Sequence, residues 1–150
     1  MIDSTDPVAS LLKAAELSRR AIEPGLLAPE PGRSAAQGAC LYASILVAST
    51  LNRFGIARAR VRGGDGAVQL GARDSRGQWN GHYWVEAEIE GHGHFVVDIT
   101  ADQFGHEPVV ILPVSQASQN YRPGPQGEVD AAAAVIATNL HCVDLIGLSA

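Results

Sequence analysis

The sequence predicts a single α+β domain, residues 1–150, in which N-terminal helices pack on an antiparallel β-sheet. Helical periodicity occupies the first third of the chain, and a strand-like alternation of apolar and polar residues occupies the middle. Glycine-rich stretches of hairpin length separate the alternating segments. Because no helix-forming segment lies between those strands, the pattern favours an antiparallel sheet over a parallel, doubly wound one.

Composition supports one folded domain and excludes several classes of protein. The chain has 150 residues, of which 46% are hydrophobic and 5% aromatic, so Ala, Val, Leu and Ile must form much of the core. A net charge of −5 with no basic run argues against nucleic-acid binding. The N-terminus lacks the segments of a signal peptide, and no apolar stretch approaches the ~20 residues that span a bilayer. We expect a cytoplasmic protein without membrane contact, with secretion that needs no cleaved signal as the open alternative.

The first helix is expected over Pro7–Ile22. Thr5 or Asp6 can cap it, and proline suits the first helical position. An apolar stripe with helical spacing follows. The helix should end before the segment 24–37, which is rich in Pro and Gly and is typical of a loop.

A second helix and a first hairpin are expected next. The helix should cover Ala39–Phe54, with Gly55 as a left-handed C-cap. The segment Ile56–Arg62 then alternates small apolar residues with Arg, which is the period of a half-exposed strand. Gly63–Gly66 is a predicted turn, and Ala67–Ala72 is the expected return strand.

Two further strands form the clearest hairpin. After a polar loop over 74–80, His82–Ile89 alternates regularly, Glu90–Gly93 turns the chain, and His94–Ile99 returns. Val109–Leu112 can add one more strand. The remaining expected elements are a Pro/Gly/Gln/Ser-rich loop over 113–127 and a helix over 131–140.

Cys40 stands in the expected first turn of the second helix, directly after Gly38-Ala39. Unpaired backbone amides at a helix N-terminus favour a thiolate over a thiol and can stabilise an oxyanion beside the sulfur. The same position suits a small buried core residue, because free Cys is among the most buried residue types. Cys40 is therefore a candidate nucleophile that needs partners.

His82 begins one strand and Asp98 ends the next. If these strands pair around Gly91, Trp84 lies opposite Asp98. His82 is then a diagonal neighbour of Asp98 on the same face, about 7–8 Å away and within reach of its side chain. Asp98 could fix the imidazole tautomer, and a thiol at the other ring nitrogen would complete a nucleophile, a base and an orienting acid. The alternative is that both side chains merely meet water.

These residues resemble the transglutaminase-like branch of the papain-like superfamily, which includes transglutaminases, bacterial transglutaminase-like peptidases, peptide N-glycanases and, more distantly, arylamine N-acetyltransferases. The similarity consists of a cysteine at a helix start, then Gly-His-x-Trp-Val-Glu and Val-Val-Asp-Ile-Thr on two strands, within about Gly38 to Phe104. It implies a nucleophile helix packed on the sheet. By this resemblance Cys40 is the nucleophile, His82 the general base and acid, and Asp98 the orienting carboxylate. It brings no metal and no other cofactor.

The resemblance implies a cysteine-dependent hydrolase or acyltransferase that acts on an amide bond through a thioester intermediate. The substrate is expected to be a peptide or protein, cleaved in its backbone or modified at a glutamine side chain. We favour hydrolysis, because water is always available and the sequence reveals no acceptor pocket. The alternative is a binding module that keeps the fold without turnover, since the chain is short for a papain-like enzyme.

Neighbours of this triad are further candidates. Gln37 could supply an oxyanion-hole amide, but a loop Gln also commonly faces solvent. Trp84 could form a wall of the substrate cleft or pack on the helix. Asp102 and Gln103 could line the site, or they could belong to a helical turn capped by Thr100 or Asp102.

Three other groups of residues have alternative interpretations. His92 and His94 form a His-x-His pair that could hold zinc together with His106, but they lie at the opposite end of the hairpin from His82. Cys142 is expected to be structural and half-buried, without a disulfide to the other cysteine. Alternating arginines form a stripe that could meet an anionic partner or be a solvated strand face; they are Arg58, Arg60 and Arg62.

Overall fold

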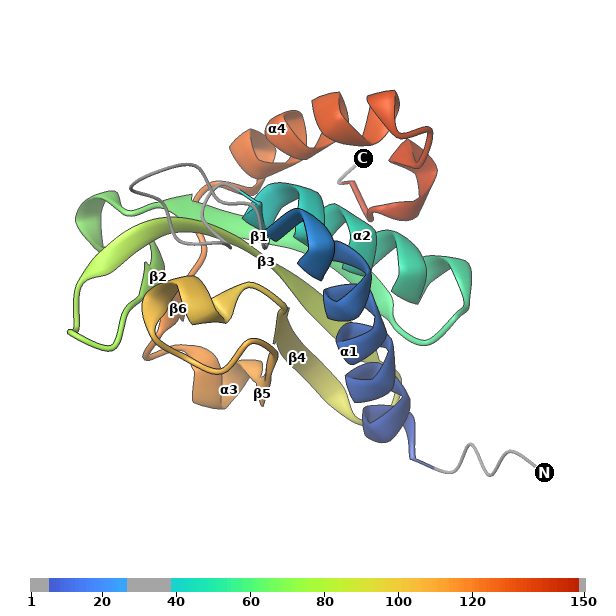
Figure 1. Ribbon diagram of the computed structural model, residues 1–150, viewed down its shortest axis with the longest axis horizontal. Coiled ribbons are helices and arrows are strands. Elements are labelled where there is room, and N and C mark those ends of the chain that lie inside the picture. The colour runs from blue at the N-terminus through green and yellow to red at the C-terminus, as the bar shows by residue number, and fades with distance from the viewer. Residues whose placement is uncertain (1–5, 27–38, 149–150) are drawn as a thin grey trace.

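The computed structural model describes residues 6–26 and 39–148 (Figure 1). Two helices, α1 (Pro7–Leu26) and α2 (Cys40–Arg53), precede a six-stranded sheet whose strand pairs are all antiparallel, and α4 (Gln126–Asn139) follows it. This order confirms the predicted α+β class and the helices-first arrangement. No helix among the described residues is both long and apolar enough to cross a membrane.

The sheet is built around β3, its longest strand. Five strands follow the order β5-β4-β3-β2-β6, and β1 pairs with β3 outside that path. The strands are β1 (Arg58–Asp65), β2 (Gly71–Arg73), β3 (Trp79–Ile89), β4 (Gly93–Asp98), β5 (Val110–Pro113) and β6 (Tyr121–Arg122). The short helices are η1 (Ala67–Gln69), η2 (Ala101–Phe104), α3 (Val114–Ala117) and η3 (Val143–Leu145).

The hairpin of β3 and β4 has the register that the sequence predicts. Val85 pairs with Val97 and Ile89 with Gly93, so the turn is centred on Gly91. Gly91 adopts a φ of +81°, a conformation that glycine reaches without steric cost. Because the side-chain period of a strand is two, this register puts His82 and Asp98 on one face at the same end of the hairpin.

Two apolar clusters cover the two faces of the sheet. Helices α1, α2 and α4 pack on the larger cluster, whose strand residues include Val61, Val85 and Val97. The smaller cluster contains Trp84 and Tyr121 and lies on the opposite face, beneath α3. Figure 1 shows α1 and α2 running side by side over one face and α3 on the other. The α2 helix therefore packs on β1 and β3.

The ends of the first two helices differ partly from the prediction. Asp6 caps α1 as expected, because its Oδ1 accepts from the backbone N–H of Val8 at 3.0 Å. However, α1 continues through Pro24 to Leu26, since burial of Leu26 and an Arg19–Glu23 ion pair hold the last turn. The second helix ends as predicted, with Gly55 at a φ of +65°.

The hairpin expected after β1 is wrong. The strand continues through the glycines to Asp65, and residues 67–72 form η1 and the start of β2, which pairs with β3 and β6. Close packing explains the glycines, since a Cβ on Gly63 would lie 2.6 Å from the Tyr83 ring. A glycine run that resembles a turn in the sequence is here a place where strands and side chains approach closely.

Three other boundaries also differ. β3 begins at Trp79, inside the segment expected to be a loop. The expected loop over 113–127 contains α3 and β6, because Ala117 and Tyr121 are buried against Trp84. The last two residues of that expected loop belong to α4, which begins at Gln126 and not at 131. The Gln126 side chain donates to the carbonyl oxygen of Val61 on β1 and so fixes the start of the helix. Tertiary contacts therefore give regular structure to parts of the segments 74–80 and 113–127, whose composition predicts loops.

Candidate active site

Cys40 is the first residue of α2 and is half-buried. The helix starts here because the residues that follow bury an apolar face on β1 and β3. Ala39 occupies the N-cap, and no side chain among residues 6–26 and 39–148 caps the helix. Backbone N–H groups of the first turn have no acceptor within the helix, so they are available beside the sulfur.

His82 and Asp98 make a direct hydrogen bond. Nε2 of His82 lies 2.8 Å from Oδ2 of Asp98, and each residue is only 1% exposed. The diagonal relation predicted from the hairpin register is therefore a contact between the side chains. Because Nε2 is occupied by the carboxylate, Nδ1 is the ring nitrogen left for proton transfer.

Asp98 accepts hydrogen bonds from three elements. The hydroxyl of Tyr121 donates to Oδ2 at 2.8 Å, and the backbone N–H of Thr100 donates to Oδ1 at 3.0 Å. Burial opposes the charged carboxylate, but His82 and these donors outweigh it and lower the pKa of Asp98. Burial and the Asp98 charge raise the pKa of Tyr121, so its hydroxyl stays a donor. The sequence does not predict Tyr121 as a site residue, because it lies in a Pro- and Gln-rich stretch without periodicity.

Two aromatic rings orient the imidazole. Trp84 stacks with His82 at 6.1 Å between ring centroids, and Phe104 meets it edge-on at 4.7 Å. Trp84 is 2% exposed and belongs to the cluster beneath α3. It therefore supports the ring of His82, and the expectation that it forms a cleft wall or packs on α2 is wrong. Strand alternation explains this, since Trp84 faces away from the side on which α2 packs.

His82 is charged more readily than a free histidine. Burial opposes the charged ring, but the charge of Asp98, its hydrogen bond and the nearby Cys40 raise the pKa of His82 to about 9. Cys40 acts on the charge of His82, and both residues line one cavity.

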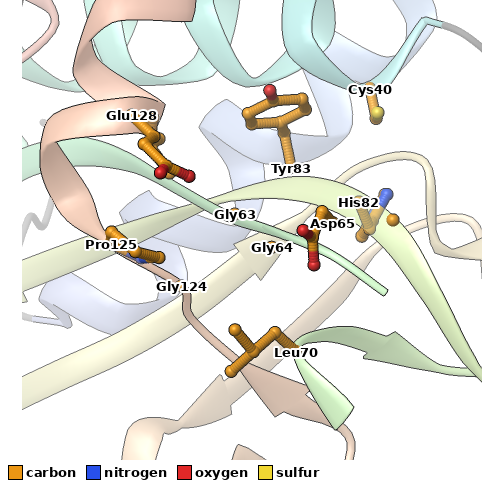
Figure 2. A pocket seen from close by; sticks show the side chains of 12 residues that line it. Cys40, Gly63, Gly64, Asp65, Leu70, His82, Tyr83, Gly124, Pro125 and Glu128 are labelled. Atoms are coloured by element: carbon orange, nitrogen blue, oxygen red, sulfur yellow. The ribbon is translucent and has the colours of Figure 1, made fainter. Parts of the chain in front are cut away.

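Cys40 and His82 open onto the same cavity, which has a volume of about 220 Å³ (Figure 2). Figure 2 shows both residues at one end of it and Glu128 and Pro125 at the other. Asp65 and Glu128 are the only carboxylates among the described lining residues. The lining consists of Cys40, Gly63, Gly64, Asp65, Leu70, Gly81, His82, Tyr83, Gly124, Pro125, Glu128 and Val129.

The segment after Asp98 adds Gln103 to the site. Its Nε2 lies 3.0 Å from Nδ1 of His82, on the far side of the ring from Asp98. Asp102 faces away from the imidazole and binds Arg19. The sequence offers both residues as candidates, and of the two only Gln103 contacts His82. Gln37, the candidate for an oxyanion-hole amide, lies outside the described residues.

The remaining candidate groups lie away from this cavity. His94 contacts Glu86 and Glu88, and Nε2 of His106 lies 2.9 Å from the carbonyl oxygen of Arg73. Across residues 6–26 and 39–148, no group of three or more His, Cys, Asp or Glu is arranged to hold a metal ion. The zinc alternative therefore has no cluster to support it there.

The arginine stripe and the second cysteine have structural partners. Arg58 pairs with Glu88, and Arg60 and Arg62 pair with Glu86, so the stripe is matched by carboxylates on β3. Cys142 is a free, half-buried thiol packed against the larger apolar cluster, and burial raises its pKa. Neither feature contacts the cavity.

Comparison with family models, with curated proteins and with solved structures finds no match to this chain. The case for a function therefore depends on the arrangement of Cys40, His82 and Asp98 around one cavity.

Proposed function

We propose that this protein is a cysteine-dependent enzyme of transglutaminase-like type that acts on an amide bond, with hydrolysis as the favoured outcome. The observation that carries the proposal is the buried 2.8 Å contact between His82 and Asp98 beside a cavity that Cys40 shares. Burying a charge costs free energy unless an oppositely charged partner compensates for it. A buried, paired group beside a cavity is therefore a candidate for a functional site. A thiol, an imidazole and a carboxylate in this order supply a nucleophile, a base and an orienting group.

In the first half of the reaction the thiol of Cys40 passes its proton to Nδ1 of His82. The sulfur then forms a bond to the amide carbonyl carbon, and the backbone N–H groups that begin α2 stabilise the oxyanion. As the carbon–nitrogen bond breaks, Nδ1 returns the proton to the departing amine. Asp98 stays ionised and stabilises the charged imidazole through Nε2.

In the second half, water attacks the carbonyl carbon of the thioester and gives a proton to Nδ1 of His82. The carbon–sulfur bond breaks, the acid leaves, and the sulfur of Cys40 takes back the proton. An acceptor amine in place of water would give acyl transfer by the same steps. Water is the acceptor we favour, because it needs no second binding site.

Thiol reactivity tests this mechanism without a known substrate. With iodoacetamide, we expect Cys40 to alkylate readily well below pH 8.5, where a free cysteine is half ionised. Cys142 should react slowly, because it is half-buried against the larger apolar cluster and burial raises its pKa. Mass spectrometry of the two cysteine peptides measures both rates in one sample.

Turnover provides the second half of the same test. On a panel of peptide and glutamine amides, Cys40→Ala should lose activity to background, whereas Cys142→Ala should keep it. A Cys40→Ala variant that turns over every amide accepted by the original chain contradicts the mechanism. A Cys40 that is as inert as Cys142 at every pH, in a protein without turnover, favours the binding module.

The charge of the cavity predicts a substrate preference. Asp65 and Glu128 line it and form no ion pair with any described residue, and His82 is the only basic residue in the described lining. We expect amides beside a positively charged group to be preferred over those beside a negative one. Glu128→Gln should lower kcat/KM for a basic substrate about threefold and leave a neutral one unchanged. Glu107→Gln, a carboxylate outside this cavity, is the matched control, and an equal effect of both variants contradicts the prediction.

A further inference from the structure

The amide of Gln103 occupies the ring nitrogen that the mechanism needs. Its Nε2 lies 3.0 Å from Nδ1 of His82, while Asp98 occupies Nε2 of the same ring. Cys40 must pass its proton to Nδ1, because no other ring nitrogen is free. An amide and a thiol therefore compete for one site on the imidazole.

Gln103 is held in this place by a partly buried ion pair between Arg19 and Asp102. Its helix η2 is fixed by Arg19, whose guanidinium donates to both oxygens of Asp102 at 2.8 Å and to the carbonyl oxygen of Ile99 at 2.8 Å. Arg19 is itself 8% exposed. Phe104, the next residue of η2, meets the imidazole edge-on. A bidentate arginine contact is geometrically specific, so the position of the amide is built into the fold.

We propose that Gln103 is a positioning residue that holds Nδ1 of His82 in its proton-accepting form and restrains proton transfer from Cys40. This inference rests on the proposed function, because it concerns the same thiol and imidazole. An N–H of the Gln103 amide can donate to Nδ1 only while that nitrogen carries no proton. The amide thus favours the neutral ring, and Nδ1 must be released before the sulfur can lose its proton.

The charged and titratable groups around His82 allow this effect to be isolated. Asp98 faces the ring from β4 and Cys40 faces it from α2, and both favour the charged imidazole. Tyr121 reaches Asp98 from β6, and Asp102 on η2 is turned to Arg19. Replacing Gln103 removes an uncharged donor and leaves each of these groups in place. A change in the pH profile of the thiol then reports the amide contact.

The test compares Gln103→Met with the unchanged protein. Met keeps the length of the side chain and removes the amide nitrogen and oxygen. The matched control is Gln116→Met, at an exposed position of α3. The rate of Cys40 alkylation by iodoacetamide is measured from pH 5 to pH 10. We expect Gln103→Met to alkylate about fivefold faster at pH 6, which is the effect of losing one net hydrogen bond. Labelling of Cys142 reports any loosening of the core. We expect the same Cys142 rate in all three proteins, because neither substitution should loosen the fold.

The outcomes separate this inference from the proposed function. A Cys40 that is reactive in the original chain and unchanged or slower in Gln103→Met overturns the role of Gln103 alone. A parallel rise in Cys142 labelling also overturns it, because the substitution then acts by loosening the fold. A Cys40 that is inert in the original chain but reactive in Gln103→Met supports the restraint. Inert thiols in both proteins overturn both proposals.

Discussion

Replacing His82 by Gln should reduce turnover of any amide substrate about 10²–10⁴-fold, the usual contribution of a general acid and base. Gln can still donate to Asp98 but cannot take a proton from Cys40 or return it to an amine. Alkylation of Cys40 near pH 7 should fall with it, because the imidazole that accepts the thiol proton is gone. The two measurements are steady-state kinetics and the iodoacetamide rate.

The pH profile makes this prediction specific. Since the pKa of His82 is raised to about 9, an imidazole that has taken the thiol proton keeps it at neutral pH and loses it as the pH rises through about 9. Cys40 of the original chain should already react at neutral pH, whereas Cys40 of His82→Gln should become reactive only as the pH approaches about 8.5, where a free cysteine is half ionised. His92→Gln, on the turn between β3 and β4, is the control and should behave as the original chain. Identical profiles for His82→Gln and the original chain would remove His82 from the mechanism.

The hairpin is the part of the site that the sequence predicts best. Alternation over residues 82–89 and the Gly91 turn determine the register, and the register places His82 diagonal to Asp98. The prediction works because β3 buries one face through Val85, Ala87 and Ile89, and a slip by one residue would turn that face to the other side of the sheet. Cys40 follows from a local signal as well, since the start of α2 is visible in the apolar periodicity.

Residues that complete the site come from segments without such periodicity. Tyr121 lies on the two-residue strand β6, which exists only because β2 pairs with it and Trp84 packs on it. The sequence offers Gln103 as a candidate but cannot assign its role, because its position depends on Arg19, more than 80 residues earlier in the chain. Long-range contacts of single residues leave no repeating pattern in a sequence. The glycines of β1 mislead for the related reason that close packing and turns both require glycine.

Replacing Asp98 by Asn should destabilise the fold by about 3–5 kcal/mol, the cost of breaking a buried ion pair by removing one partner. The asparagine side chain would keep the volume but lose the charge. It would also present an N–H₂ group where Oδ2 now accepts from both His82 and Tyr121. The midpoint of urea unfolding measures this loss of stability. The loss is large compared with the free energy of unfolding of a natural domain, which is roughly 5–15 kcal/mol.

The pH dependence of that loss follows from the two pKa shifts. The pKa of Asp98 is lowered in the folded state, so its contribution is complete above the unfolded value near 4 and disappears as the pH falls through the folded one. The pKa of His82 is raised to about 9, so its contribution is complete below about 6.5 and disappears as the pH rises through about 9. The difference between the original chain and Asp98→Asn should therefore be greatest between about pH 4 and 6.5.

Two variants separate the charge of Asp98 from its hydrogen bonds. Tyr121→Phe removes one donor to Oδ2 and leaves the ion pair, so it should cost about 1–2 kcal/mol with a weaker pH dependence. Asp144→Asn removes an exposed carboxylate of η3 and should change the unfolding midpoint little. If Asp98→Asn is as stable as Asp144→Asn at every pH, the pair contributes nothing to the fold. A pair that does stabilise the fold links stability to the proposed chemistry, because the carboxylate that joins β4 to β3 through His82 is the one that the proposed mechanism uses to stabilise the charged imidazole.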